Sequence, residues 1–299
     1  MITFLSGGTG TPALIRGVRQ ILYDSEIAVV ANTAEDLWIS GGHCAPDIDT
    51  AVFLFAGILD TGRWWGIKGD TYATHNYLPK VAGGEPFPVG DRARAVQIAR
   101  AGLLSRGMSL TEAVQAQCRS LNIGATVLPM TDGDAALYVD TGTEHIPLLE
   151  YRMTADPGTE VRELVGPEPP AVTDGVRAAI EASDAVVIGP ANPAASILPI
   201  LDCAGMRDLL RDAFVVAVSP FSAGVAPDQD AALMYAVGEP PTAPAVSRLY
   251  GDIVDVFVQD IHDPDDVPGS LRLETRLMHE RQAESLAWDI MAVIRHAIS

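Results

Sequence analysis

Short apolar runs alternate along this chain with longer segments in which apolar residues recur every three or four positions. The short runs have the length and the valine and isoleucine content of buried strands, whereas the longer segments have helical spacing. Strands are predicted at residues 2–5, 27–31, 185–188, 214–218 and 254–258. Helices are predicted after the first strand and at residues 51–59, 93–106, 110–121 with Ser109 as cap, 174–182, 206–212 and 275–298. This alternation predicts an α/β fold, with a Rossmann-like, mostly parallel sheet and helices on both faces.

Residues 125–155 depart from this alternation. Strand-like runs at 125–129, 135–139 and 145–151 are separated by Gly and Asp turns, which predicts a small inserted β-rich or helical segment with antiparallel pairing. The chain shows no internal repeat, low-complexity tract or obvious linker. We therefore expect residues 1–299 to form a single α/β domain that contains this insertion.

The first strand leads into the glycine loop Ser6-Gly7-Gly8-Thr9-Gly10-Thr11-Pro12 and then into a helix. Glycines allow a sharp turn and close approach of the backbone to an anion, and the free N–H groups of a helix N-terminus attract phosphate. The loop fits the G-x-G-x-x-A fingerprint, but Asn32 or Thr33 occupies the place of the acid that binds a ribose in nicotinamide enzymes. No Gly-Lys-Ser or Gly-Lys-Thr follows, so it is not a Walker loop either. The pattern indicates a phosphate site, with a ligand-free glycine turn as the alternative.

Two carboxylates, Asp47 and Asp49, stand two residues apart after the second strand. Paired carboxylates close to a phosphate site suggest metal-assisted phosphoryl chemistry. An Asp-x-Asp pair beside a proline is also typical of a solvated turn, with Asp49 or Thr50 as a helix cap. The density of polar side chains between Asn32 and Asp49 favours the functional interpretation. His43 lacks a second histidine at ligand spacing, so we expect a polar loop residue rather than a zinc ligand.

Aromatic residues and a second loop extend the candidate site. Trp64 and Trp65 are adjacent, which commonly means one ring in the core and one at its rim, but they could also form a wall for a flat ligand. Asp91 is placed to cap the helix that follows it, and Arg92 could bind a phosphate.

The composition limits the partners. The formal net charge is −19, which argues against a nucleic-acid or anionic-membrane surface because both require a basic footprint. The acidic excess fits either a salty cytoplasm or solubility. Three widely spaced cysteines and the absence of a signal-like or membrane-spanning run predict a cytoplasmic protein with reduced thiols.

Six ordered motifs together resemble the 2-phospho-L-lactate transferases, the family that assembles the deazaflavin coenzyme F-420 in archaea and some bacteria. The motifs are the glycine loop, Asn32-Thr33-Ala34-Glu35-Asp36-Leu37-Trp38, Pro46-Asp47-Ile48-Asp49-Thr50, Trp64-Trp65-Gly66, Gly90-Asp91-Arg92, and Gly189-Pro190-Ala191-Asn192-Pro193 with Ser196-Ile197.

The resemblance implies a Mg²⁺-dependent transfer of 2-phospho-L-lactate, or an enolpyruvyl phosphate, from lactyl-2-diphospho-5′-guanosine to the ribityl hydroxyl of the deazaflavin Fo. The products are coenzyme F-420-0 and GMP, and a homodimer is expected. Asp47 and Asp49 are the implied catalytic residues and metal ligands. The implied Fo contacts are Asp49, Trp65, Pro88, Gly90 and Asp91. The implied guanosine diphosphate contacts are Gly8, Thr9, Gly10, Thr11, Asn32, Gly189, Asn192 and Ser196.

Two departures from the family pattern affect these expectations. Pro88 stands where a long residue such as lysine is common, so only backbone contact is expected there. The segment 221–228 lacks the lysine with which the family's loop usually ends. Two other classes stay open as alternatives: a non-catalytic regulator that binds a nucleotide or nucleotide sugar, and a nicotinamide oxidoreductase, which the missing ribose acid disfavours.

Overall fold

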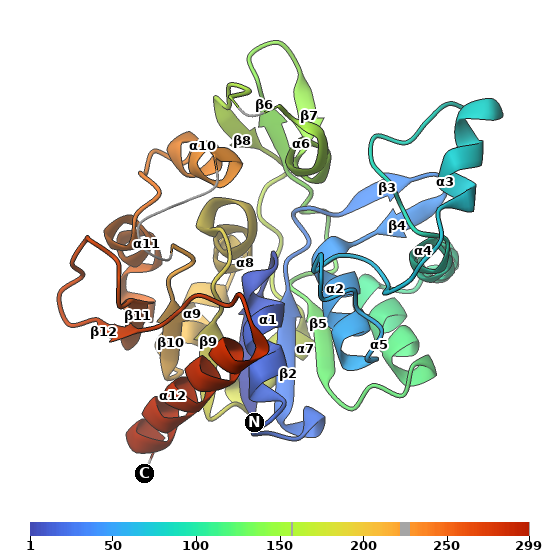
Figure 1. The fold of residues 1–299 in the computed structure, drawn as a ribbon. Coiled ribbons are helices and arrows are strands. Elements are labelled where there is room, and N and C mark those ends of the chain that lie inside the picture. The colour runs from blue at the N-terminus through green and yellow to red at the C-terminus, as the bar shows by residue number, and fades with distance from the viewer. Residues whose placement is uncertain (157, 222–227, 299) are drawn as a thin grey trace.

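A seven-stranded parallel sheet forms the centre of the computed structural model, which describes residues 1–156, 158–221 and 228–298 (Figure 1). Its strand order is β12-β11-β10-β9-β1-β2-β5, and each neighbouring pair is parallel. The strands are β1 (Ile2–Ser6), β2 (Ile27–Ala31), β5 (Thr126–Pro129), β9 (Ala185–Ile188), β10 (Val215–Val218), β11 (Val256–Asp260) and β12 (Leu271–Leu273). The strand order reverses between β1 and β9, as in doubly wound nucleotide-binding folds. The predicted fold class is confirmed.

Helices cover both faces of this sheet (Figure 1). They are α1 (Gly10–Val18), α2 (Pro46–Phe55), α3 (Ala73–Tyr77), α4 (Asp91–Leu104), α5 (Leu110–Ser120), α6 (Leu148–Thr154), α7 (Asp174–Glu181), α8 (Leu198–Asp202), α9 (Met206–Arg211), α10 (Asp228–Ala236), α11 (Ala243–Tyr250) and α12 (Glu280–Ile298). Single turns are η1 (Asp24–Glu26), η2 (Leu78–Lys80), the π-helical η3 (Pro193–Ile197) and η4 (Gly251–Ile253).

Two apolar cores lie on opposite faces of the sheet because successive strand residues point to opposite sides. Within β2, Val29 packs into the core beneath α1, α2 and α12, whereas Val30 packs into the core beneath α7 and α8. Gly17 lets α1 approach α12 closely, since a Cβ there would overlap the carbonyl of Ala283. The strands are buried on both faces, which explains their uninterrupted apolar sequences.

Two small antiparallel sheets stand above the carboxyl ends of the strands. One is the hairpin of β3 (Leu37–Ile39) and β4 (Gly42–Cys44). The other has the order β7-β6-β8 and consists of β6 (Tyr138–Asp140), β7 (His145–Pro147) and β8 (Glu163–Val165), with α6 attached. The strand expected at 125–129 is β5, which joins the parallel sheet and not the antiparallel segment. The strand expected at 145–151 ends at Pro147, where α6 follows.

Most other predicted elements agree with the structure within a few residues. Ser109 caps α5, and its side chain accepts a hydrogen bond from the Glu112 amide in a capping box, as predicted. The helix predicted at 51–59 differs in a way that affects the site, because α2 begins at Pro46 and ends at Phe55. Its N-cap is Ala45, so neither Asp49 nor Thr50 caps it.

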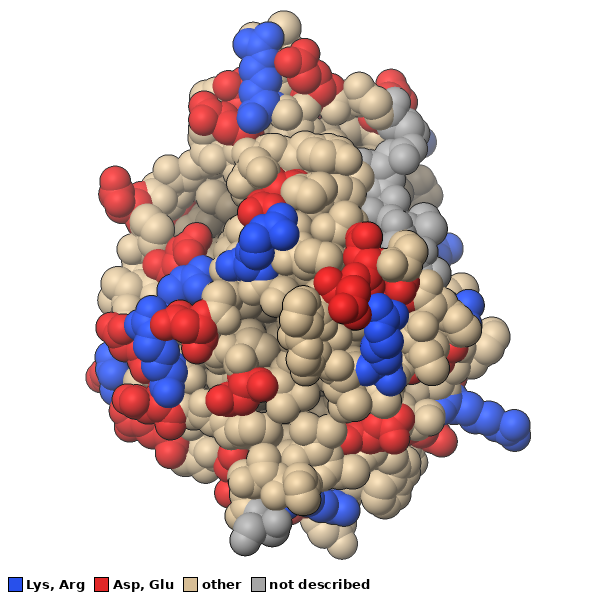
Figure 2. Space-filling model, turned by 90° about the vertical axis from the view of Figure 1, so that its left-hand side faces the viewer, with Lys and Arg blue, Asp and Glu red and all other residues tan. Residues whose placement is uncertain are grey.

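Charges of both signs lie side by side on the surface, and Figure 2 shows this mixture on one face. Ion pairs such as Arg211 with Asp252 and Arg248 with Glu239 place opposite charges together.

Within the described ranges, no helix is long and apolar enough to cross a membrane.

Candidate active site

The two glycine loops at the switch point pack against each other. A Cβ at Gly10 would overlap the carbonyl of Pro190, and one at Gly189 would overlap the side chain of Thr11. Gly8 differs, because it has a φ of +59° and the nearest described atom that its Cβ would meet is the Cβ of Ala191, at 4.0 Å. The sequence predicted that the glycine-loop backbone approaches an anion closely. At Gly10 and Gly189 the close neighbour in this structure is another loop of the chain.

Buried polar residues behind these loops join the strand ends. Asn32 donates through Nδ2 to Asp47 Oδ2 at 2.9 Å and accepts from the Ala34 amide at 3.0 Å. Asn192 caps the turn η3 by accepting from the Ala195 amide. The hydroxyls of Thr11 and Ser196 are buried without hydrogen-bond partners among the described residues. These side chains shape the site from behind, whereas Gly8 and Thr9 line an open cavity.

Asp47 and Asp49 lie in the first turn and a half of α2 and point in different directions, since residues two apart on a helix do not share a face. Asp47 lines the large cavity, which has a volume of about 360 Å³, and Asp49 lines a small pocket next to it. The two-residue spacing of Asp47 and Asp49 suggested that they bind one metal ion together. On a helix the same spacing directs the two carboxylates to different faces.

Asp47 is held by the glycine loop and the second strand end. Its Oδ1 accepts from the Gly8 amide at 2.8 Å, and its Oδ2 accepts from Asn32. Burial, followed by the nearby carboxylate of Glu35, raises the pKa of Asp47 to about 8. A cation placed in the large cavity would favour the ionised form of this carboxylate.

Asp49 is paired with Arg100, a fully buried arginine of α4. Arg100 also donates to Gln117 Oε1 at 3.0 Å and to the His43 carbonyl at 3.1 Å. Gln97, one turn before Arg100, donates to Asp49 Oδ2 at 3.3 Å. These donors hold the carboxylate in one orientation at the edge of the small pocket.

Asp36 and His43 complete the group of buried ionisable side chains. Neither oxygen of Asp36 has a hydrogen-bond partner within the described ranges, although Oδ2 lies 3.6 Å from His43 Nε2. Burial raises the pKa of Asp36 well above its ordinary value, against an opposing effect of Arg100. Burial and then Arg100 lower the pKa of His43 to about 4. His43 packs edge-on against Trp38 and is a buried residue of strand β4, so the expectation of a loop residue was wrong.

The large cavity is lined by the glycine loop, the start of α2, the loop that contains Trp64 and Trp65, and α6. Its lining residues are Gly8, Thr9, Glu35, Pro46, Asp47, Thr50, Arg63, Trp64, Trp65, Tyr72, Pro88, Leu149, Arg152 and Met153. Its volume is in the range of small-molecule sites. Of the residues that the structure describes, Glu35, Asp47, Arg63 and Arg152 are the charged ones that line it, and Glu35 pairs with Arg152 at 2.7 Å.

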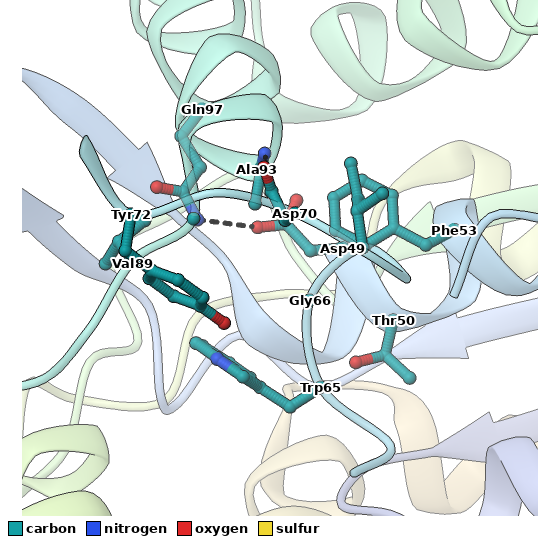
Figure 3. Close-up of a pocket in the computed structure, with 12 residues that line it drawn as sticks. Asp49, Thr50, Phe53, Trp65, Gly66, Asp70, Tyr72, Val89, Ala93 and Gln97 are labelled. Atoms are coloured by element: carbon teal, nitrogen blue, oxygen red, sulfur yellow. Dashed lines mark hydrogen bonds between the residues drawn. The ribbon is translucent and has the colours of Figure 1, made fainter. Parts of the chain in front are cut away.

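The small pocket lies between α2 and α4 and shares Thr50, Trp65 and Tyr72 with the large cavity. Figure 3 shows the rings of Tyr72 and Trp65 directed into the same space as the carboxylate of Asp49. Trp65 also packs edge-on against Phe87, with ring centroids 6.2 Å apart. Trp64 lies beneath the Arg16 guanidinium. Both tryptophans are half-buried. The shared residues make the two spaces adjacent parts of one site.

Asp91 does not cap its own helix, contrary to expectation. Its carboxylate accepts from the amides of Ala73 and Thr74 at the start of α3, at 3.0 and 2.9 Å. In return, Asp70 accepts from the amides of Arg92 and Ala93 at the start of α4. The hydrogen bonds that Asp91 accepts, first that of the Thr71 hydroxyl and then those of the α3 amides, hold the pKa of Asp91 below its usual range.

The other predicted acceptor-side residues take different places. Gly90 lines the small pocket and lacks room for a Cβ beside Asp70, whereas Pro88 lines the large cavity. Arg92, the possible phosphate ligand, donates to the Lys68 carbonyl at 2.5 Å. Residues 222–227, most of the segment in which the family's lysine is missing, lie outside the described residues.

Arg100, Gln97 and Arg152 are site residues that the sequence analysis missed. The stripe Ala93, Gln97, Arg100 and Ala101 has helical spacing, and two polar residues on such a stripe signal a buried polar site. Leu149, Arg152 and Met153 form a similar face of α6, which the strand prediction for 145–151 obscured.

No group of three His, Cys, Asp or Glu side chains among the described residues is arranged to hold a metal ion. Asp47 is the carboxylate of the predicted pair that faces the large cavity, and each of its oxygens retains a second lone pair. A carboxylate oxygen that faces this cavity suits Mg²⁺, which is commonly held by one or two carboxylates together with substrate phosphates.

Comparisons with known proteins identify the family of this chain. The chain matches the family model described as 2-phospho-L-lactate transferase CofD over residues 2–294. Proteins named 2-phospho-L-lactate transferase are 46% identical in Methanocorpusculum labreanum, over 98% of this chain and 98% of that protein, and 44% identical in Methanospirillum hungatei, over 97% and 99%. A crystal structure of a UPF0052-family protein from Bacillus halodurans shares the fold, with a TM-score of 0.57 and 16% identity over 89% of this chain and 81% of that chain. The chain therefore belongs to the 2-phospho-L-lactate transferase family.

Proposed function

We propose that this protein transfers the 2-phospho-L-lactate group, or an enolpyruvyl phosphate, from lactyl-2-diphospho-5′-guanosine, or its enolpyruvyl analogue, to the ribityl hydroxyl of Fo. The products with the lactyl donor are coenzyme F-420-0 and GMP. Family membership supports the reaction class. The observation that carries the proposal is the pair of adjacent spaces, which meet at Thr50, Trp65 and Tyr72. A two-substrate transfer requires such neighbouring sites.

The donor occupies the large cavity in this proposal. Gly8 and Thr9 lie at the N-terminus of α1, whose N-cap residue Thr9 makes no side-chain cap and whose first turn has no acidic residue. The Gly8 amide already donates to Asp47, so the donors for phosphate are the amides that follow it. Backbone N–H groups at such a terminus favour phosphate. The packed residues Gly10, Thr11, Asn32, Gly189, Asn192 and Ser196 keep this loop in position.

Fo lies against Trp65 and Tyr72, which line both spaces, with its ribityl chain directed to Asp49. The small pocket has a volume of about 10 Å³, enough for one water-sized group, so it receives only the reacting end of that chain. The hydroxyl oxygen of Fo attacks the phosphorus that carries the lactyl group and forms a new P–O bond. The bond from that phosphorus to the bridging oxygen breaks, and GMP leaves with the electron pair. Asp49, held by Arg100 and Gln97, orients the hydroxyl and accepts its proton.

We propose Asp47 as the protein ligand of Mg²⁺ at the donor phosphates. When bound there, the ion neutralises negative charge on the diphosphate. Arg63 and Arg152 are the basic side chains that line the same cavity.

The test is to incubate the purified protein with Mg²⁺, Fo and lactyl-2-diphospho-5′-guanosine and to separate the products by chromatography. We expect a phosphodiester of Fo and an equal amount of GMP, and no product in excess EDTA. An undiminished rate in EDTA would overturn the role of the metal. Binding of the guanosine compound without turnover, at any metal concentration, would favour a nucleotide-binding regulator instead.

A further inference from the structure

One face of α6, the helix attached to the antiparallel sheet β7-β6-β8, lines the large cavity. Leu149, Arg152 and Met153 of α6, at positions i, i+3 and i+4, all line it. Leu149 is buried against the core of the hairpin β3–β4 and of the loop that contains Phe87. This packing fixes α6 relative to the cavity, and with it the base of the Arg152 side chain.

The guanidinium of Arg152 is anchored at one end and open at the other. Nη1 donates to Glu35 Oε1 at 2.7 Å, and Nη2 lies 3.7 Å from Asp230 Oδ1. The side chain is 24% exposed, and the bond to Glu35 is its one hydrogen bond within the described part of the chain. An arginine has five N–H donors, so donors remain for a ligand in the cavity.

Nearby carboxylates stabilise the charged form of Arg152 and leave part of its guanidinium accessible from the cavity. Glu35, then Asp230 and Asp47, raise the pKa of Arg152 above its ordinary value. Arg63, the other basic lining residue, is 65% exposed and donates to the Tyr72 hydroxyl at 3.1 Å. Arg152 is therefore the better desolvated of the two, and an ion pair with phosphate gains strength where water is excluded.

We propose that Arg152 binds a phosphate of the guanosine-containing donor and that Glu35 is its positioning residue. The identity of the donor rests on the proposed function, but the phosphate contact does not. The planar guanidinium can engage phosphate oxygens with its free N–H groups while Nη1 stays on Glu35. The antiparallel segment thus supplies a ligand contact that the parallel sheet does not.

A structural role is the competing explanation. Arg152 could serve only to connect α6 to Glu35 after β2 and to Asp230 in α10. In that case the loss of either partner of the Glu35 pair should have the same effect. A phosphate-binding role predicts that the loss of Arg152 is much more harmful than the loss of Glu35.

Calorimetric titration of GDP in Mg²⁺ buffer separates these roles in four variants. Arg152→Gln should weaken GDP binding about 10- to 100-fold, the range for charged hydrogen bonds, and Arg152→Lys by less. Glu35→Gln should lose less affinity than Arg152→Gln, because a glutamine oxygen still accepts from Nη1. Arg162→Gln is the matched control, since Arg162 also pairs with a glutamate, Glu160, but does not line the cavity. It should bind GDP like the wild type.

The melting temperature of each variant checks the fold, and the double variant Glu35→Gln/Arg152→Gln avoids a buried unpaired carboxylate if Arg152→Gln proves unstable. That double variant should still bind GDP as weakly as Arg152→Gln. Equal losses in Glu35→Gln and Arg152→Gln, or no loss in folded Arg152→Gln, would overturn the proposal. So would a wild type that binds neither GDP nor inorganic pyrophosphate. Failure of the wild type to bind Fo would count against the proposed function alone.

Discussion

Replacing Asp49 with asparagine would change two things at once: the counter-ion of the buried Arg100 and the carboxylate at the edge of the small pocket. The shape is preserved, and an asparagine oxygen can still accept from Arg100. What is lost is the negative charge. The variant should still fold, but the buried Arg100 loses its charged partner, so its stability should fall.

The magnitude follows from the burial of the pair. Removing one partner of a buried ion pair costs about 3–5 kcal/mol. Asp49→Asn should cost less, about 2–3 kcal/mol, because the amide oxygen keeps one hydrogen bond to Arg100. For a chain of 299 residues this corresponds to a fall in melting temperature of about 3–5 °C. Turnover should fall by about 10²-fold or more.

Thermal denaturation and single-turnover kinetics on the same preparation measure the two effects. Asp24→Asn is a matched control, since Asp24 pairs with Arg19 through two hydrogen bonds of 2.8 Å outside both spaces of the site. It should melt slightly lower and turn over normally. An Asp49→Asn protein with unchanged melting would refute the stabilising role of the pair. Near-normal turnover in a destabilised protein would reduce Asp49 to a structural counter-ion.

Three further predictions concern the loops, the aromatic wall and pH. Gly10→Ala should destabilise the fold because the new Cβ would overlap the Pro190 carbonyl. Gly8→Ala should weaken GDP binding and should lower the stability by about 1 kcal/mol, because the φ of Gly8 is positive. Melting temperatures and GDP titrations of both variants test this, and it would be contradicted if the two variants behaved alike. Trp65→Ala should lower Fo affinity by about 1–3 kcal/mol in a fluorescence titration, and an unchanged affinity would leave Trp65 as a packing residue. The pKa of His43 is about 4 in the folded protein and 6.5 in the reference state, so its stabilising effect is complete above pH 6.5 and is lost as pH falls toward 4. Urea denaturation should show that acidification from pH 7 to pH 5 costs the wild type about 2 kcal/mol more than His43→Asn, and parallel pH profiles would refute the assignment.

The sequence predicted the parallel sheet well because buried parallel strands are continuous apolar runs bounded by turns. The strands at 27–31 and 185–188 have the predicted bounds. The partner of a strand is harder to predict, because pairing depends on contacts distant in sequence. The run at 125–129 looked like part of an antiparallel segment and is the edge strand of the main sheet.

The residues of the site were easier to predict than their arrangement. The motifs located both carboxylates, but α2 starts early enough to turn Asp47 and Asp49 apart. Pro46 at the first helical position was the available signal for that start. Arg100 and Arg152 come from helices far along the chain, and no local spacing connects them to a carboxylate. Tertiary packing alone brings each to its partner.

The exchange of caps between α3 and α4 has a consequence for motion. Asp70 holds the amides that begin α4, and Asp91 holds those that begin α3, so neither helix start can fray without releasing the other. Residues 70–93 should therefore open as one cooperative unit, with the amide protons of Ala73 and Ala93 exchanging at a common rate. That unit carries Tyr72, Val89 and Gly90 of the small pocket. Admission of a bulky acceptor would then be an all-or-none event on that side, governed by two aspartates whose carboxylates are bound to backbone amides.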